Sequence, residues 1–213
     1  MTEPRILVMA KAPVPGSVKT RLRLPPEEAA RLQEAMICDA VEKAASVAPV
    51  TVAASPAAEL DSVRKLIPAD APLLAQPEGD LGHRMLAGAS ELFDRGGAPV
   101  LVIGTDAPTL PASYLRDALV SLEAGSDVAL APSEDGGYVM IGLRKPYATL
   151  FEGISWSTPQ VYGQTVETAR RAGFRVYETG LWYDVDVPED LERLRAELAR
   201  DPALAPHTAG LLG

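Results

Sequence analysis

Short apolar runs alternate with longer amphipathic stretches along the chain. Four of the runs contain almost no polar residue, which is typical of strands buried on both faces of a sheet. Two further runs are additional strand candidates. We predict strands at residues 6–9, 50–53, 100–103, 128–131, 138–141 and 174–177.

Stretches with apolar residues at helical spacing lie between and after these strands. Thr158 before Pro159 has the form of a helix N-cap followed by proline at the first helical position. Pro188 opens a last helix, whose acidic first turn suits the helix dipole. The expected apolar stripes are Leu32, Met36, Ala40 and Ala44, then Leu81, Met85, Ala89 and Leu92, and finally Leu191, Leu194 and Leu198.

This alternation of strands and helices predicts an α/β fold, with a mostly parallel central sheet covered by helices on both faces. Such sheets bind ligands outside the carboxyl ends of their strands, so residues that carry chemistry should follow strands directly. We expect one domain over residues 1–200. Residues 201–213 are expected to form a loosely attached tail.

Composition and charge exclude several functional classes. The 213 residues are 47% hydrophobic and carry a net charge of −9, which argues against nucleic acid and against anionic membrane surfaces as partners. No apolar stretch approaches the ~18 residues that span a bilayer, and the N-terminus has no signal-peptide pattern. The lone Cys38 cannot form an internal disulfide. These features predict a cytoplasmic protein.

The segment after the first strand carries a local positive charge. Residues 11–23 hold four cations and no acid, although the whole chain is acidic. One charge pair at ~4 Å contributes about 4 kcal/mol at an effective dielectric of ~20, so several cations could hold a polyphosphate. Gly16 would let the backbone approach phosphate oxygens. The alternative is an ordinary solvated loop.

Acidic residues follow two later segments. Asp106 comes directly after the strand at 100–103, where a carboxylate can hold Mg²⁺ or Mn²⁺. A turn before Pro108 is an equally good interpretation. Asp184 and Asp186 are two positions apart in an extended segment, so they point the same way and could complete a metal site. Capping of the last helix is the alternative role for Asp186.

Two more segments are candidates for contacts with a ligand. Glu134, Asp135, Gly136 and Gly137 follow the strand at 128–131, and the same residues also predict a hairpin turn. Gln76 and Gly79 lie in a loop before a helix, where a side-chain amide and backbone amides can read a base edge. The local alternative there is a loop with Asp80 as N-cap.

The remaining candidates are isolated residues. Trp156 either walls a pocket or packs in the core. His83 and His207 have no partner at metal-ligand spacing, so a zinc site is not favoured. Cys38 lies inside a helix without a neighbouring base and is expected to pack rather than react.

In this order, the segments from about Arg5 to Leu194 resemble a bacterial family of uncharacterised GT-A-type transferases, often named glycosyltransferases. More distantly, they resemble phospholactate guanylyltransferase and molybdenum-cofactor guanylyltransferase. The resemblance implies a three-layer, Rossmann-like GT-A fold, also called the nucleotide-diphospho-sugar transferase fold. It places Lys11, Lys19 and Arg21 in the phosphate-binding loop, and it places Asp106 and Asp186 at metal-binding carboxylates.

The chain departs from both transferase patterns. The usual Gly-x-Gly-Thr-Arg of the first loop is reduced to Gly16 and Lys19-Thr20-Arg21, and the mid-chain Asp-x-Asp of glycosyltransferases is a lone Asp106. We therefore expect a metal-dependent transferase with a nucleotide donor and a small-molecule acceptor, leaning to nucleotidyl transfer. Glycosyl transfer from a nucleotide-sugar and a non-catalytic nucleotide-binding module are the alternatives.

We expect the site residues to divide by role. Lys19, Arg21 and Asp106 would be catalytic, and Asp106 and Asp186 would hold Mg²⁺ or Mn²⁺. Lys11, Gly16, Gln76 and Gly79 would bind the nucleotide. The acceptor side would be lined by Glu134, Asp135, Gly136, Gly137 and Trp156.

Overall fold

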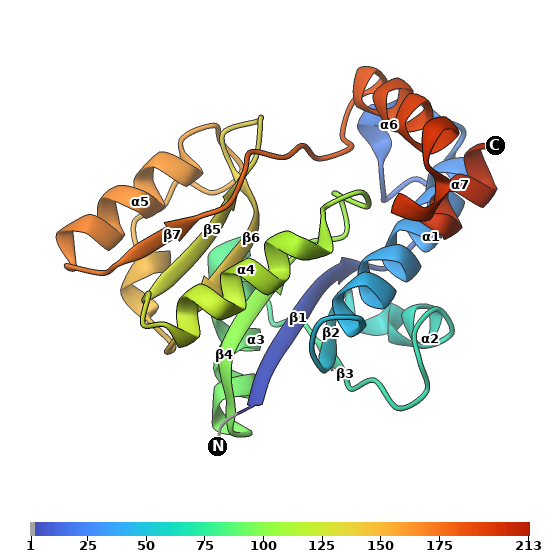
Figure 1. The fold of residues 1–213 in the computed structure, drawn as a ribbon. Coiled ribbons are helices and arrows are strands. Elements are labelled where there is room, and N and C mark those ends of the chain that lie inside the picture. Colours follow the sequence, from blue (N-terminus) through green and yellow to red (C-terminus); the bar gives the residue numbers. More distant parts are fainter. Residues whose placement is uncertain (1–2) are drawn as a thin grey trace.

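A computed structural model describes residues 3–213, and its centre is one seven-stranded sheet in the order β3-β2-β1-β4-β6-β5-β7 (Figure 1). Only β6 runs antiparallel to its neighbours, which confirms the mostly parallel sheet. In the parallel pairs around β1, Ile6 lies opposite Val50 and Leu101. The strands are β1 (Glu3–Lys11), β2 (Val50–Ser55), β3 (Leu73–Ala75), β4 (Gly97–Ile103), β5 (Val128–Pro132), β6 (Tyr138–Leu143) and β7 (Val176–Glu178).

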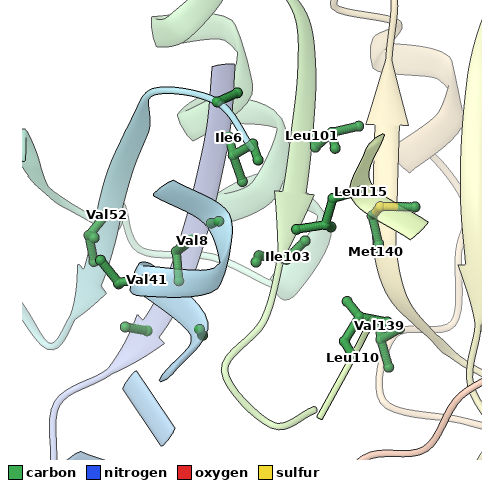
Figure 2. Close-up of a cluster of buried hydrophobic side chains, with 14 of the residues drawn as sticks. Ile6, Val8, Val41, Val52, Leu101, Ile103, Leu110, Leu115, Val139 and Met140 are labelled. Carbon is green, nitrogen blue, oxygen red and sulfur yellow. The ribbon is translucent and has the colours of Figure 1, made fainter. Parts of the chain in front are cut away.

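Helices cover both faces of the sheet, because successive side chains of each strand point to opposite sides. Ile6 and Val8 of β1 pack in one buried cluster with side chains of the first and fourth helices, such as Val41 and Leu115 (Figure 2). Leu7, between them, packs on the other face against the third helix. The helices are α1 (Pro26–Ala45), α2 (Leu60–Arg64), α3 (Leu81–Asp94), α4 (Ala112–Glu123), α5 (Val161–Arg171), α6 (Pro188–Arg200) and α7 (Pro206–Leu212). Short 3₁₀ helices are η1 (Thr20–Leu22), η2 (Ala57–Glu59), η3 (Ala148–Phe151) and η4 (Pro202–Leu204).

Within residues 3–213, no helix combines the length and the apolar character that crossing a membrane requires.

The segment expected to be a loosely attached tail is instead folded onto the domain. Residues 202–212 form η4 and α7, and α7 packs beside α1. The carboxylate of Asp39 in α1 accepts hydrogen bonds from the backbone nitrogens of His207 and Thr208, each at 2.9 Å, and from Thr208 Oγ1 at 2.6 Å. Thr208 is fully buried. The prediction was wrong because this contact joins residues about 170 positions apart.

The start of α5 also differs from its prediction. The helix begins at Val161 rather than Pro159, with Gln160 as its N-cap residue. Thr158 donates its hydroxyl to the carbonyl of Ser155 at 2.6 Å, so it closes the preceding turn instead of capping the helix. Ser157 between them has a left-handed backbone with φ of 62°. The start of α6 at Pro188 is as predicted, and Leu191, Leu194 and Leu198 are buried there.

One buried carboxylate fastens the β5–β7 edge of the sheet. Asp127, just before β5, accepts hydrogen bonds from the backbone nitrogen of Arg175 and from the hydroxyl of Tyr147, both at 2.9 Å, and pairs with Arg144. The Arg175 N–H is the largest of the causes that lower the pKa of Asp127 to about 2, followed by the Arg144 guanidinium. The charged form of Asp127 therefore stabilises the folded state.

Candidate active site

Two adjoining pockets open at the carboxyl ends of β1 and β4. The loop pocket, of about 330 Å³, is lined by the segment after β1 and by side chains facing it. The hairpin pocket, of about 590 Å³, is lined by the turn between β5 and β6 and by the segment before α5. The two share one wall, made of Met9, Arg21, Leu81, Asp106 and Asp186.

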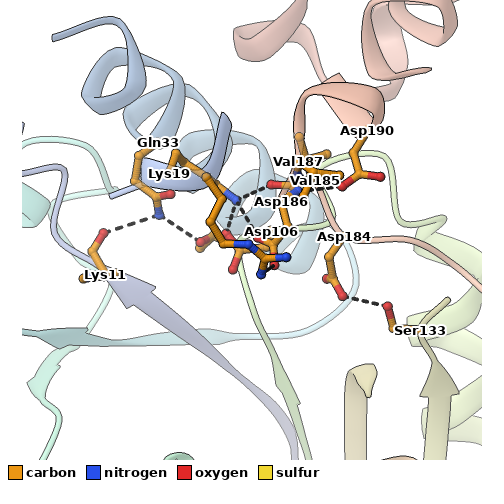
Figure 3. Close-up of polar contacts among 12 residues, drawn as sticks. Lys11, Lys19, Gln33, Asp106, Ser133, Asp184, Val185, Asp186, Val187 and Asp190 are labelled. Carbon is orange, nitrogen blue, oxygen red and sulfur yellow. Dashed lines mark hydrogen bonds and ion pairs between the residues drawn. The ribbon is translucent and has the colours of Figure 1, made fainter. Parts of the chain in front are cut away.

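Lys19 lines the loop pocket and reaches two carboxylates of this shared wall, Asp106 and Asp186. Buried Val18 and Leu22 anchor the chain on either side of it, and Lys19 itself has a left-handed backbone with φ of 49°. Its side chain is only 4% exposed. Its Nζ donates to Asp106 Oδ1 at 2.5 Å and to the carbonyl of Val185 at 2.8 Å, and it lies 3.9 Å from Asp186 Oδ1 (Figure 3). The basic loop and Asp106 therefore belong to one site.

The segment after β4 and the segment before α6 are joined through their backbones. Val185 donates its N–H to the carbonyl of Asp106 at 2.8 Å. Asp190, in the first turn of α6, accepts from the N–H groups of Asp186 and Val187, both at 2.9 Å (Figure 3). Asp190 thus takes the helix-capping role, and the Asp186 side chain is left to face Lys19 and Arg21. Arg21 Nη1 lies 3.3 Å from Asp186 Oδ2.

Several carboxylates face one another across the hairpin pocket. Burial is the main cause that raises the pKa of Asp184 to about 7, and the charges of Asp106, Asp135 and Asp186 raise it further. A hydrogen bond from Ser133 Oγ to Asp184 Oδ2, at 2.7 Å, opposes that rise (Figure 3). Burial likewise raises the pKa of Asp186, although Lys19 lowers it.

Asp184 and Gln33 contribute to the site more than their sequence positions indicated. Asp184 is a wall residue of the hairpin pocket in its own right. Gln33 lies inside α1, where it is buried and donates to Thr105 Oγ1 at 3.0 Å and to the carbonyl of Lys11 at 3.4 Å. It ties the ends of β1 and β4 together. The sequence carried no signal for Gln33, because it reads as one polar position in an amphipathic helix.

The residues expected to bind nucleotide are only partly brought to the loop pocket. Lys11 lines it and donates to the carbonyl of Ser17 at 2.5 Å. Gln76 also lines it, but its Nε2 is held by the carbonyls of Ala10 and Ala53 at 3.0 and 2.8 Å.

Gly16 and Gly79 line neither pocket. Asp80 accepts from the N–H of His83 at 2.8 Å and caps α3, so the local alternative for that loop is confirmed. Arg84, one turn into α3, lines the loop pocket although no role was predicted for it.

Of the residues expected on the acceptor side, some line the hairpin pocket and others do not. Asp135 and Gly137 line the hairpin pocket, while Glu134 and Gly136 do not. Glu134 accepts from Arg193 Nη1 with both carboxylate oxygens, at 3.0 and 2.9 Å, and so pairs with α6. Gly136 has φ of 88°, and a Cβ there would lie 2.2 Å from the carbonyl oxygen of Pro159. It is a contact point between the turn and the segment before α5.

Trp156 forms a fixed wall of the hairpin pocket. A Cβ added to Gly82 of α3 would lie 2.3 Å from its Cζ2 atom, so the indole rests directly on the helix backbone. It also stacks on Phe151, with 6.2 Å between ring centroids. Trp156 is therefore both a wall residue and a packed one.

Asp106 and Asp186 are the residues that could hold a divalent metal. Among residues 3–213, no group of three His, Cys, Asp or Glu side chains converges as a complete metal site. Mg²⁺ commonly takes only one or two protein carboxylates and completes its shell with substrate phosphates and water. Asp106 and Asp186 fit this donor set, because both carboxylates already point toward one positive charge, the ammonium of Lys19.

Comparison with known proteins identifies related sequences and structures. Residues 38–158 match a family described as an uncharacterized protein conserved in bacteria (DUF2064). A Desulfovibrio desulfuricans G20 protein, provisionally described as a nucleotide-diphospho-sugar transferase, is 33% identical over 100% of this chain and 97% of its own, with a TM-score of 0.88. No curated protein matches the sequence.

Two more distant structures share the fold. The first is CMP:2-keto-3-deoxy-manno-octonic acid synthetase complexed with CTP, at 15% identity and a TM-score of 0.62, covering 94% of this chain and 100% of its own. The second is Rv0371c of Mycobacterium tuberculosis H37Rv complexed with manganese, at 14% identity and a TM-score of 0.56, covering 91% and 98%. At these identities the likeness establishes the fold alone. The nucleotide-diphospho-sugar transferase fold that the family resemblance implied is confirmed.

Proposed function

The chain belongs to this family of uncharacterized bacterial proteins (DUF2064), and we propose that it is a metal-dependent transferase that moves a nucleotidyl group to a small-molecule acceptor and releases pyrophosphate. The observation that carries the proposal is the meeting of two pockets at Asp106 and Asp186, whose carboxylates both lie next to Lys19 of the loop pocket. A two-substrate reaction needs two adjoining sites with the charge-stabilising groups at their junction. The similarity to the Desulfovibrio protein over the full length supports the transferase class.

In this proposal the nucleotide donor occupies the loop pocket. Lys11, Lys19, Arg21 and Arg84 line it, so its walls carry the charge that a triphosphate requires. Lys19 is nearly buried, and a cation held away from water interacts more strongly with phosphate than an exposed one. The CTP complex of a protein with the same fold agrees with a nucleotide as donor.

Asp106 and Asp186 would hold Mg²⁺ or Mn²⁺, in keeping with the manganese complex of Rv0371c. When bound, the metal supplies positive charge that neutralises the donor phosphates. Lys19 and Arg21 then stabilise the charge that develops on the departing pyrophosphate, because Arg21 belongs to the wall shared by the two pockets and Lys19 contacts the carboxylates of that wall. The acceptor enters the hairpin pocket beside Asp135, Gly137 and Trp156.

Glycosyl transfer from a nucleotide-sugar is the second candidate, and the description of the Desulfovibrio protein favours it. In that reaction a nucleoside diphosphate departs and the metal carries most of its charge. The four cations of the loop pocket exceed this need, and we therefore prefer nucleotidyl transfer.

Product analysis separates the candidates. Nucleoside triphosphates and nucleotide-sugars would each be incubated with Mn²⁺ and a panel of alcohols, sugars and sugar phosphates, and pyrophosphate and nucleoside diphosphate would be quantified. We expect acceptor-dependent pyrophosphate release from a triphosphate. Acceptor-dependent release of nucleoside diphosphate from a nucleotide-sugar, without pyrophosphate from any triphosphate, would establish glycosyl transfer instead. Tight nucleotide binding that is indifferent to metal, with no turnover, would indicate a non-catalytic binding module.

A further inference from the structure

The two pockets carry opposite charge, and this difference bears on the acceptor. Four cations and two carboxylates line the loop pocket. Of the described residues that line the hairpin pocket, Arg21 is the one cation, and it is already paired with Asp186. Four acidic side chains line the same pocket: Asp106, Asp135, Asp184 and Asp186. A metal held by Asp106 and Asp186 would neutralise those two and leave the Asp135 carboxylate to face the acceptor.

Another part of the hairpin pocket's lining is apolar. Met85, Val139 and Val161 form buried parts of this wall. Trp156 presents an indole that Gly82 and Phe151 hold in place. Leu81 at the shared wall is 46% exposed, which leaves apolar surface open to a ligand. A volume of about 590 Å³ is ample for a compound of one or two rings.

We propose that the acceptor is an uncharged alcohol bearing an aromatic or similarly flat apolar group, and that anionic acceptors are excluded. The apolar group lies against Trp156 and Leu81, and the hydroxyl donates to the Asp135 carboxylate. A phosphate or carboxylate in the same place would meet like charges in a partly buried site, where repulsion is poorly screened. This inference rests on the proposed function for the role of the pocket, but it concerns binding alone.

The test uses the intact protein and two probes with the same ring, 2-phenylethanol and phenyl phosphate. The chain has two tryptophans, so a ¹⁵N-labelled sample has two indole N–H resonances, assigned with Trp156→Phe. Trp182 lines neither pocket and its Nε1 is buried, so its resonance is an internal reference. We expect 2-phenylethanol to shift the Trp156 resonance and phenyl phosphate to bind at least about tenfold more weakly.

Two matched variants test the cause. Asp135→Asn should reduce the difference in affinity between 2-phenylethanol and phenyl phosphate. Asp117 is an exposed carboxylate on α4 outside both pockets, so Asp117→Asn should leave that difference unchanged. Equal or tighter binding of phenyl phosphate would overturn the charge argument. Absence of any Trp156 shift with 2-phenylethanol would overturn the assignment of a flat apolar acceptor. Nucleotide binding with Mn²⁺, measured separately, reports on the loop pocket, so failure there would reject the proposed function and not this result.

Discussion

Asp106→Asn removes one negative charge from the shared wall and keeps the shape of the side chain. The carboxylate is 47% exposed, and an ion pair involving such a group contributes about 0–1 kcal/mol. An asparagine oxygen can still accept from Lys19, and the backbone bond from Val185 N–H to the Asp106 carbonyl does not depend on the side chain. The free energy of unfolding should therefore fall by less than about 1 kcal/mol, which lowers Tm by no more than about 2–4 °C in a chain of this length.

Ligand binding should change far more than stability. A neutral amide is a poor ligand for a divalent cation, and loss of even an outer-shell partner typically costs about 10–100-fold in metal affinity. We expect nucleotide affinity in the presence of Mn²⁺ to fall by about 100-fold or more in Asp106→Asn, while the weak affinity without metal is retained. Isothermal titration of CTP and GTP, with and without Mn²⁺, measures both quantities.

Asp117→Asn on α4 is the matched control, since it makes the same change of charge on an exposed carboxylate outside both pockets. It should bind nucleotide and Mn²⁺ as the unmodified protein does. The reasoning would be refuted if Asp106→Asn did the same, because Asp106 would then be a turn residue with no part in metal binding.

Three further predictions follow from other parts of the structure. Lys19→Met should cut turnover by roughly 10²–10³-fold and reduce nucleotide affinity much less, because Lys19 acts on the charge of the leaving group. Arg23→Met removes an exposed cation outside both pockets and should leave kcat unchanged, so an equal loss of kcat in the two variants, measured by steady-state kinetics, would contradict the role of Lys19. Asp127→Asn should lower the free energy of unfolding by about 2 kcal/mol at neutral pH. In the unmodified protein this stabilisation is present above the ordinary pKa of 3.8 and is lost as pH falls toward about 2, so the free energies of unfolding of the two proteins, measured with urea, should become equal in acid. Asp39→Asn should weaken the attachment of α7, lower stability by about 1–3 kcal/mol and expose residues 201–213 to limited proteolysis; an unchanged digestion pattern would show that other contacts hold α7.

The core strands could be predicted because each lies between two layers of helices. Such a strand has to be apolar on both faces, and residues 6–8 of β1 are fully buried. β3 was missed because its three residues are only partly buried or exposed. α4 was not predicted, although its buried residues lie at helical spacing: Leu115, Ala118, Leu119 and Leu122.

The site could be predicted where a residue lies in the segment that follows a strand, and not where its place depends on a distant side-chain partner. Lys19 and Asp106 are 87 positions apart but meet, because β1 and β4 are neighbours in the sheet. Glu134 also follows a strand, yet it turns outward to Arg193 of α6. Nothing near Glu134 in the sequence indicates that α6 supplies a cation at that point.

The two glycine contacts beside the hairpin pocket restrict how its specificity can change. At Gly82 and Gly136 the backbone touches the Trp156 indole and the Pro159 carbonyl with no room for a methyl group, so both glycines hold residues of the pocket wall in place. Substitutions there would displace α3 or the β5–β6 turn instead of trimming the cavity. A directed-evolution library aimed at new acceptors should therefore vary Trp156 and Leu81, where side chains alone define the space, and hold both glycines constant.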